Sequence, residues 1–306
     1  MKIGYIGDSA YRTVLEHTRD ITLNINEDTE AVLVEDPRIS GSIDLPVLNT
    51  SPSIAHMLSD KIYRDQFYKL HDIKDAQPVT YLAGFISSIE LSPMIEVAYS
   101  TRMLTGSIGA HAGKVQGTAI AVDKNYMYEA IPGLQPIVES LQQLRYHGNI
   151  AFGISSDFRV CQLILGHDTM LFALYNELAT KSMDDYYEAC ISSNCEFPEL
   201  HMNALAVTTL VSAPPYPFIE KASNIKAPPP AEKHLYREQR GLAEVGFVCC
   251  WGLDAQEAKR RVRRTLEKIS SYEKEVQYRT DYGWKETFML SSQRWRELGG
   301  IHSRMS

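Results

Sequence analysis

Residues 105–112 read T-G-S-I-G-A-H-A. Gly106 and Gly109 lie three residues apart around Ser107, and glycine lets a loop approach another group closely because it has no Cβ. Backbone amides exposed in such a loop are good donors to anions and carboxylates. We therefore predict that this loop is a ligand-binding surface, with His111 at its rim as a candidate catalytic proton carrier. The alternative is a tight hairpin turn.

The segment that follows the loop alternates helical and strand patterns. Apolar residues recur at helical spacing from about Pro132, and a helix there ends at Tyr146-His147-Gly148, because glycine is a common helix terminator. We predict a strand over residues 149–154, a turn at 155–157 and a partner strand over 158–165. One helix face is apolar and consists of Leu134, Ile137, Val138, Leu141 and Leu144.

This order resembles the second half of the ATP-grasp domain in the glycinamide ribonucleotide synthetase (phosphoribosylamine–glycine ligase) family. That family has a T-G-G-M-G-A-Y-S loop, a helix, a Y-x-G-x-x-x-x-G strand and a V-x-E-F-N strand; the matching stretches here are 105–112, 146–153 and 160–164. The resemblance implies an α+β fold with an α/β N-terminal part, ATP-grasp-like mixed sheets and flanking helices. It also implies ATP and magnesium as cofactors if the protein is active, and none otherwise.

Two family features are missing. Gln162 stands where the family has a metal-binding glutamate, and Ile164 stands near its asparagine, so we predict that the magnesium site is lost. His167, Asp168 and Asp157 are candidate substitute ligands, although such loop residues are more often turn or capping residues. Residues 89–92 look like the family's E-V-S strand, and almost the whole ATP lid is absent between Lys61 and that stretch.

Lys61 is the candidate phosphate ligand in the first half of the chain. Apolar residues at helical spacing between Ser51 and Ile73 predict two helices, with Ser59 or Asp60 as the cap between them. The stretch resembles the family's L-x-G-S-K-x-F-x-K-x-F segment, whose first lysine binds ATP phosphate at the position of Lys61. The alternative is a solvated lysine at a helix start.

The N-terminus has the pattern of a short strand, a glycine turn and a helix. We expect a strand over residues 2–6, then Gly7 and Ser9 in a turn that binds an anion or serves only packing, then a helix over 10–22. Residues 31–34 and 45–48 predict two further buried strands.

The last third predicts a buried strand over residues 204–211, another over 245–251 and a long amphipathic helix. Asp254 and Glu257 form a capping box for that helix. The arginines of this helix indicate either a nucleic-acid-binding surface or a charged face that points to solvent, and we prefer the second interpretation. Arg279 and Asp281 match the family's Y-R-x-D-I-G ending, and we expect them to bind a ribose phosphate or to form a structural salt bridge.

Composition limits the class of protein. The chain has 306 residues, 44% hydrophobic and 23% charged, with a net charge of −7. This acidic balance makes nucleic acid an unlikely partner. No apolar run is long enough for a membrane span, and we expect a cytoplasmic protein with five reduced cysteines. We predict three domains: a reduced α/β domain over 1–50, a central ATP-grasp-like domain over 51–200, and an antiparallel sheet with a long helix over 201–306.

Two functional hypotheses remain open at this point. In the first, the protein is an ATP-dependent carboxylate–amine ligase that works through an acyl phosphate. In the second, it is a catalytically inactive ATP-grasp descendant that binds a small molecule or a protein. We expect a small-molecule substrate with a carboxylate or phosphate, no membrane partner, and leave a homodimer open.

Overall fold

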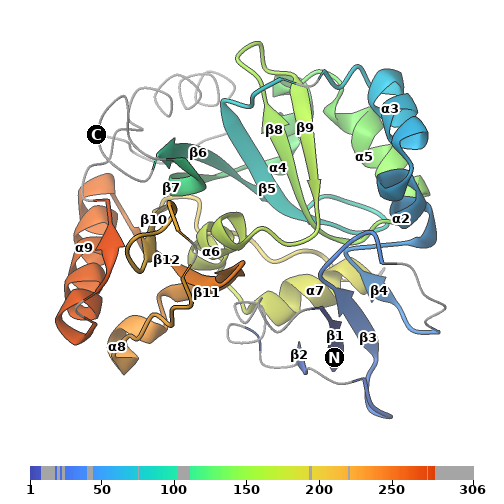
Figure 1. Ribbon diagram of the computed structural model, residues 1–306. Helices are drawn as coiled ribbons and strands as arrows, with labels where there is room; N and C mark the ends of the chain where they lie inside the picture. Colours follow the sequence, from blue (N-terminus) through green and yellow to red (C-terminus); the bar gives the residue numbers. More distant parts are fainter. Residues whose placement is uncertain are drawn as a thin grey trace.

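The computed structural model describes most of the chain and places its N-terminal strands in a small parallel sheet (Figure 1). The sheet has the order β2 (Ile21–Thr22), β1 (Ile3–Ile6), β3 (Ala31–Val34) and β4 (Val47–Leu48). The described residues are 1–7, 18, 21–22, 25–39, 44–74, 76–102, 111–192, 195–219, 221–273 and 275–279. Most of the helix expected over 10–22 lies outside these residues. The prediction is wrong at its end, because Ile21 and Thr22 form a strand that pairs with β1.

Two capped helices follow the small sheet. In α2 (Pro52–Ser59) the Ser51 hydroxyl accepts a hydrogen bond from the Ile54 amide at 3.2 Å. In α3 (Lys61–Leu70) the Asp60 carboxylate accepts one from the Ile62 amide at 2.8 Å. These bonds satisfy amides that have no partner inside the helix. The predicted pair of helices, with Asp60 as the cap between them, is confirmed.

The chain passes from α3 to the main sheet through residues 71–79, without a lid subdomain. Within the described residues the main sheet has nine strands, and all of their pairings are antiparallel. Its order is β11 (Leu235–Arg240), β12 (Ala243–Gly252), β10 (Leu205–Ser212), β7 (His111–Val122), β6 (Met94–Arg102), β5 (Thr80–Ile86), β8 (Gly148–Ile154) and β9 (Val160–Leu165), with β13 (Gln277–Tyr278) paired to β10. Strand β10 pairs with β7, so this one sheet contains strands from both sides of the domain boundary predicted at residue 200. The division into three domains stays a prediction.

Alternating apolar side chains cover both faces of the main sheet. One face packs against α6 (Thr169–Leu178), α7 (Met183–Ile191) and the small sheet; there Phe85 meets Tyr175 with ring centroids 5.1 Å apart. The other face packs against α2, α3, α5 (Leu134–Gln143) and α9 (Ala255–Tyr272). Each face therefore has a separate core, and a side chain's place in the two-residue alternation decides which core it enters.

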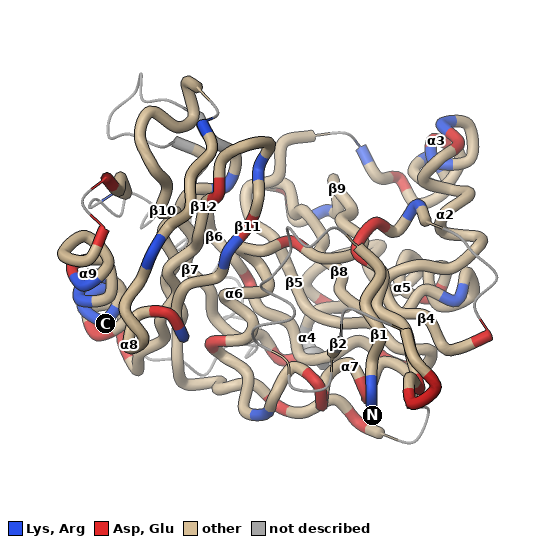
Figure 2. Tube along the Cα trace, turned by 60° about the horizontal axis from the view of Figure 1, so that its bottom comes forward, with Lys and Arg blue, Asp and Glu red and all other residues tan. Residues whose placement is uncertain are grey.

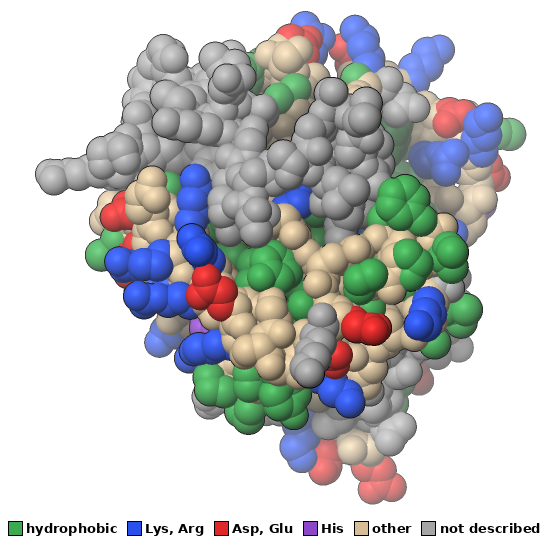
Figure 3. Space-filling view, turned by 60° about the vertical axis from the view of Figure 1, so that its left-hand side comes forward, with side chains coloured by type: hydrophobic (Ala, Val, Ile, Leu, Met, Phe, Trp, Pro, Cys, Tyr) green, Lys and Arg blue, Asp and Glu red, His purple; other side chains and the backbone are tan. Residues whose placement is uncertain are grey.

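The C-terminal helix α9 forms as predicted. Asp254 caps it by accepting a 2.7 Å hydrogen bond from the Glu257 amide, and Glu257 in turn accepts one from the Leu253 amide. Its buried stripe consists of Ala258, Val262, Leu266 and Ile269. Lysine and arginine positions are concentrated along α9 in the tube of Figure 2, and lysine and arginine side chains gather on the side of the molecule that Figure 3 shows. Arg260, Arg263 and Arg264 are exposed. The arginines of α9 therefore lie on a charged outer face, which is the interpretation that we preferred from the sequence.

Three shorter elements complete the described fold. They are α4 (Lys124–Ala130), α8 (Pro229–Glu232) and a turn at residues 87–90. The predicted strand over 89–92 is wrong: only Leu91 makes an isolated bridge, to Ile86, because the Ser87 side chain and backbone close a tight turn with Glu90. In the part of the chain that the structure describes, no helix is long and apolar enough to cross a membrane.

Candidate functional site

A cavity of about 460 Å³ opens on the face of the main sheet that carries α6. Its walls come from parts of the chain that are far apart in sequence: β5, β6, β7, the start of α6, and β11. The charged and aromatic side chains that line it are Tyr81, Tyr99, Lys114, His167, Asp168, Glu238 and Arg240. Pockets of roughly 300–1,000 Å³ are typical of small-molecule sites.

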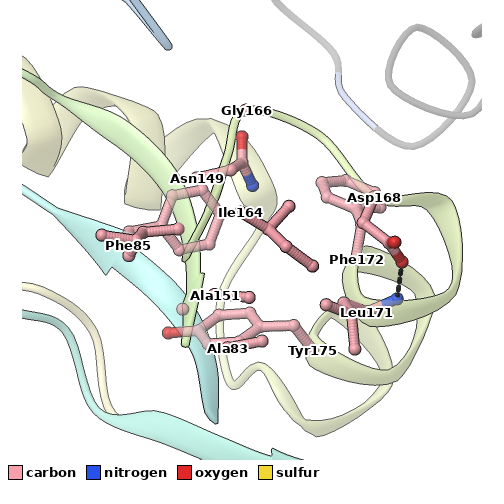
Figure 4. A pocket seen from close by; sticks show the side chains of 12 residues that line it. Ala83, Phe85, Asn149, Ala151, Ile164, Gly166, Asp168, Leu171, Phe172 and Tyr175 are labelled. Carbon is pink, nitrogen blue, oxygen red and sulfur yellow. Dashed lines mark hydrogen bonds between the residues drawn. The ribbon is translucent and has the colours of Figure 1, made fainter. Parts of the chain in front are cut away.

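Lys114 and Asp168 form the first ion pair of this cavity. The Lys114 Nζ lies 2.5 Å from the Asp168 carboxylate, and both side chains are mostly buried, at 17% and 23% exposure. Asp168 also caps α6 by accepting a 3.0 Å hydrogen bond from the Leu171 amide (Figure 4). Burial alone would raise the pKa of Asp168, but the Lys114 ammonium, the Leu171 amide and His167 together outweigh burial, and the pKa lies below its ordinary value.

Glu238 and Arg240 form the second pair, at 3.0 Å. They are two residues apart on β11 and therefore lie on the same face of the strand. Burial raises the pKa of Glu238, although Arg240 opposes this effect. Both ion pairs line the same cavity, so they form one cluster of four charged side chains. Its formal charges, two positive and two negative, sum to zero.

A buried carboxylate of α6 fixes β11 at the edge of the cavity. Glu177 accepts a hydrogen bond of 3.2 Å from the Tyr236 hydroxyl and lies 3.1 Å from the His234 Nδ1. The Asn176 side chain donates to the same Tyr236 hydroxyl at 2.7 Å. Since a buried carboxylate needs hydrogen-bond partners, these contacts hold β11 against α6. Glu238 and Arg240 follow directly on the same strand.

Two tyrosines form the aromatic wall. The rings of Tyr81 and Tyr99 have centroids 5.1 Å apart, and the Lys114 Nζ lies 4.6 Å above the Tyr81 ring. The Tyr99 hydroxyl donates to the Pro78 carbonyl at 2.8 Å. Burial raises the pKa of both tyrosines, so both stay neutral donors. This wall offers a flat apolar surface beside the charge cluster.

Thr169, the first residue of α6, lines the same cavity. Its side chain is buried, with 2% exposure, and its hydroxyl has no hydrogen-bond partner among the described residues. Buried polar groups normally have such a partner. Thr169 also stands at a helix N-terminus, where the first backbone amides have no partner inside the helix and the helix dipole is positive.

The residues at the expected metal position do not fit magnesium. The Gln162 amide oxygen accepts a 2.8 Å hydrogen bond from Tyr81. Ile164 lies among apolar side chains in a small hollow of about 20 Å³ between β8 and α6 (Figure 4). Magnesium needs hard oxygen ligands with negative charge. Among the described residues, no group of three or more His, Cys, Asp and Glu side chains could hold a metal ion.

The three substitute ligands do not form an alternative site. Asp168 is already paired with Lys114. Asp157 lies on the turn between β8 and β9, where its pKa is lowered chiefly by a hydrogen bond from Ser155. His167 lines the cavity beside Asp168, and its ring packs against Phe172 with centroids 4.8 Å apart.

Much of the predicted binding loop lies outside the described residues, as do Gly106, Ser107, Gly109, Ser9 and Asp281. His111 begins β7 and pairs with Arg102, but nothing is described of its side chain. Thr101 and Gly113, close to the two described ends of this segment, both line the cavity. The loop's role as a binding surface therefore stays a prediction.

The structure does not bring the other predicted ligand residues together in this cavity. Lys61 is exposed at the start of α3, which packs against the opposite face of the main sheet. Gly7 follows β1, where an added Cβ would collide with Glu35. Arg279 is buried, with 7% exposure, and donates to the Ser100 hydroxyl at 2.8 Å. None of these three is among the residues that line the cavity.

Sequence reasoning missed Lys114, Glu238 and Arg240. The signal for the last two was present, because alternation in the stretch L-Y-R-E-Q-R over 235–240 is typical of a strand with Tyr236, Glu238 and Arg240 on one face. Lys114 carried no local signal. Its role follows from the position of Asp168, which lies far away in sequence.

Neither a protein-family model nor a curated protein sequence matches the chain. Solved structures do match. A phosphoribosylamine–glycine ligase from Thermotoga maritima has a TM-score of 0.56 at 11% identity, covering 92% of this chain and 100% of the other. A urea carboxylase from Kluyveromyces lactis has a TM-score of 0.50 at 11% identity, covering 89% of this chain and 26% of the other. An N5-carboxyaminoimidazole ribonucleotide synthetase, solved as an ADP complex, reaches 0.48 at 9% identity, covering 90% and 98%.

At these identities the first two matches establish the fold and not the activity. They agree with the small parallel sheet and the large antiparallel sheet with its helices. The resemblance found in the sequence is confirmed at the level of structure, and this chain has an ATP-grasp-like fold.

Proposed function

We propose that the protein binds a small molecule in the cavity between the start of α6 and the main sheet, as an ATP-grasp descendant that has lost magnesium–nucleotide chemistry. The observation that carries this proposal is the convergence of Lys114, Asp168, Glu238 and Arg240 on one cavity of about 460 Å³. Cationic side chains in a cavity are suited to a carboxylate or phosphate. The aromatic wall adds apolar contact.

The chemistry of the donors argues against a nucleotide triphosphate at this site. Among the described residues that line the cavity, Lys114 and Arg240 are each already paired with a carboxylate. A triphosphate with its several negative charges would therefore meet no net positive charge. Gln162 stands where the resembling family has a glutamate ligand for magnesium, and Ile164 stands near that family's asparagine ligand. We therefore derive no step through ATP or magnesium.

The ligase hypothesis remains the second candidate, and one observation favours it. The similarity to the Thermotoga maritima phosphoribosylamine–glycine ligase spans the full length of that chain. Under this hypothesis the protein would join a carboxylate to an amine, and it would need a nucleotide site built differently from the expected one. A cytoplasmic location and a homodimer stay predictions under both hypotheses.

Thermal unfolding with added ligands tests the proposal. We would measure the Tm of the wild type with acetate, succinate, inorganic phosphate, ribose 5-phosphate and single amino acids, because a ligand that binds the folded state raises the Tm. Arg240→Met should reduce the shift caused by any compound that binds. Arg264→Met, on the exposed face of α9, is the matched control. Shifts that are equal in both variants would place the ligand elsewhere and contradict the proposal.

A further inference from the structure

Three basic residues form a row along the outer face of α9. Arg260, Arg264 and Lys268 follow one another at intervals of four residues, so they are neighbours on the helix surface with a rise of about 6 Å between them. All three side chains belong to exposed residues. Like charges at this spacing repel each other and destabilise a helix. An anionic partner that lies along the row would remove this repulsion.

The nearby carboxylates of α9 do not neutralise the row. Glu257 pairs with Arg261 at 2.7 Å, and Glu267 pairs with Arg263 at 2.9 Å. Among the described residues, no ion pair involves any of the three residues of the row. The net charge of −7 is a sum over the whole chain, and this surface departs from it by carrying unpaired positive charge.

A stack of aromatic rings borders the row. Trp251, near the end of β12, stacks on His201 with ring centroids 5.5 Å apart and ring planes at 14°. The Arg261 guanidinium lies over the same indole ring, 4.9 Å from its centroid, and donates a 3.0 Å hydrogen bond to the Trp251 carbonyl. Arg261 lies three residues before Arg264 and is therefore its neighbour on the helix. His201 is exposed, so the stack offers a flat ring to a ligand beside the basic row.

This combination of features suits single-stranded nucleic acid. Cations along a surface follow the phosphates of the strand, and exposed rings stack on its bases, because every base has a flat π face. Arginine is well suited to phosphate, since its guanidinium offers two parallel N–H donors. Lipid headgroups and carboxylate side chains could satisfy the basic row, but they offer no flat ring to stack on His201.

We propose that α9 and the Trp251–His201 stack form a binding surface for single-stranded nucleic acid. Its phosphates lie along Arg260, Arg264 and Lys268, and one of its bases stacks on His201. None of these residues lines the cavity at the start of α6, so the proposal is independent of the ligand that the cavity binds. From the sequence alone we preferred a face that points only to solvent. The structure adds the stack, which joins residues that are far apart in the chain.

Fluorescence anisotropy of the full chain with a labelled thymidine oligonucleotide of about 20 nucleotides tests the basic row. Three phosphate contacts should give a slope of about −2 in a plot of log K against log salt, since each contact with a single strand contributes about −0.7. The double variant Arg260→Met, Lys268→Met should reduce this slope to about −0.7. The control replaces Lys69 and Arg145, two exposed cations on α3 and after α5, by methionine and should keep the wild-type slope. Equal slopes in the variant and the control would overturn the basic row as the binding surface.

The stack has its own readout in the same assay. His201→Ala should weaken binding at least about fivefold without changing the salt slope, because it removes a ring and no phosphate contact. His201→Phe keeps a flat ring and should bind as the wild type does. An abasic strand of the same length should bind at least about fivefold more weakly than the thymidine strand. Equal binding of the abasic strand would overturn the stacking, and binding to phosphatidylserine vesicles without binding to the oligonucleotide would overturn the choice of partner. Absence of binding by the oligonucleotide and the vesicles would overturn the proposal as a whole.

Discussion

Replacing Lys114 by methionine tests the charge cluster most sharply. The change keeps much of the side chain's length and removes its charge, so the nearly buried Asp168 carboxylate loses its cation. Removing one partner of a buried ion pair costs about 3–5 kcal/mol. Because the two side chains keep 17% and 23% exposure, we expect a loss of about 2–4 kcal/mol in the free energy of unfolding at pH 7.5.

The pH dependence gives this prediction a second readout. In the wild type the pKa of Asp168 is below its ordinary value, because Lys114, with smaller contributions from the Leu171 amide and His167, outweighs the effect of burial. Its stabilising contribution is therefore present above about pH 4 and is lost as the pH falls through the pKa of the folded state. In Lys114→Met only burial and the cap remain, and we expect the pKa of Asp168 to rise. Protonation then relieves the unpaired charge, so the difference in stability between variant and wild type should shrink as the pH is lowered from about 7.5 to about 4.5.

Urea denaturation at several pH values measures both effects. The matched control is Lys226→Met, since Lys226 is exposed in a loop; we expect its cost to stay within about 0.5 kcal/mol at every pH. A loss in Lys114→Met that equals this control, or one that does not change with pH, would refute the reasoning about the ion pair.

Further predictions concern the fold and the contact made by Gln162. Val262→Asp should unfold or aggregate the protein, because it places an unpaired charge in a fully buried stripe, whereas Arg264→Ala should change the unfolding free energy by less than about 0.5 kcal/mol; circular dichroism melting distinguishes them. Gly148→Ala should cost more than Gly133→Ala in urea denaturation: both have positive φ, at 124° and 87°, but only at Gly148 would a Cβ collide with a neighbouring side chain. Gln162→Leu should cost about 1 kcal/mol by the same assay, because it removes the hydrogen bond from Tyr81. Equal effects within either pair, or a neutral Gln162→Leu, would contradict the assignment of those contacts.

The sequence was informative where the cause of structure is local. Asp60 and Asp254 could be predicted as helix caps because a capping bond joins residues only two or three positions apart. The apolar stripe of α9 follows from helical periodicity alone. The prediction that magnesium does not bind at Gln162 also has a local cause, because the Gln162 side chain lacks the charge that magnesium requires, and it stays a prediction.

The cavity could not be predicted in the same way. Lys114 and Asp168 are 54 positions apart, and they meet because β7 lies beneath α6. The pair on β11 lies at the edge of the sheet, and the contacts of Tyr236 and His234 with Glu177 hold that strand at the cavity. These contacts between distant residues depend on the order of the strands in the sheet, and the local hydrophobic periodicity of the sequence does not determine that order. The strand predicted over residues 89–92 failed for a related reason, since the Ser87 turn overrode a pattern that looks extended.

Calorimetric titration of the wild type with magnesium ATP tests the central claim most directly. We expect no saturable binding up to millimolar nucleotide, because the described side chains of the cavity carry no net positive charge and Gln162 and Ile164 offer no anionic ligand to the metal. Saturable binding of magnesium ATP in the micromolar range that is weakened by Arg240→Met and left intact by Arg264→Met would contradict the claim and favour the ligase.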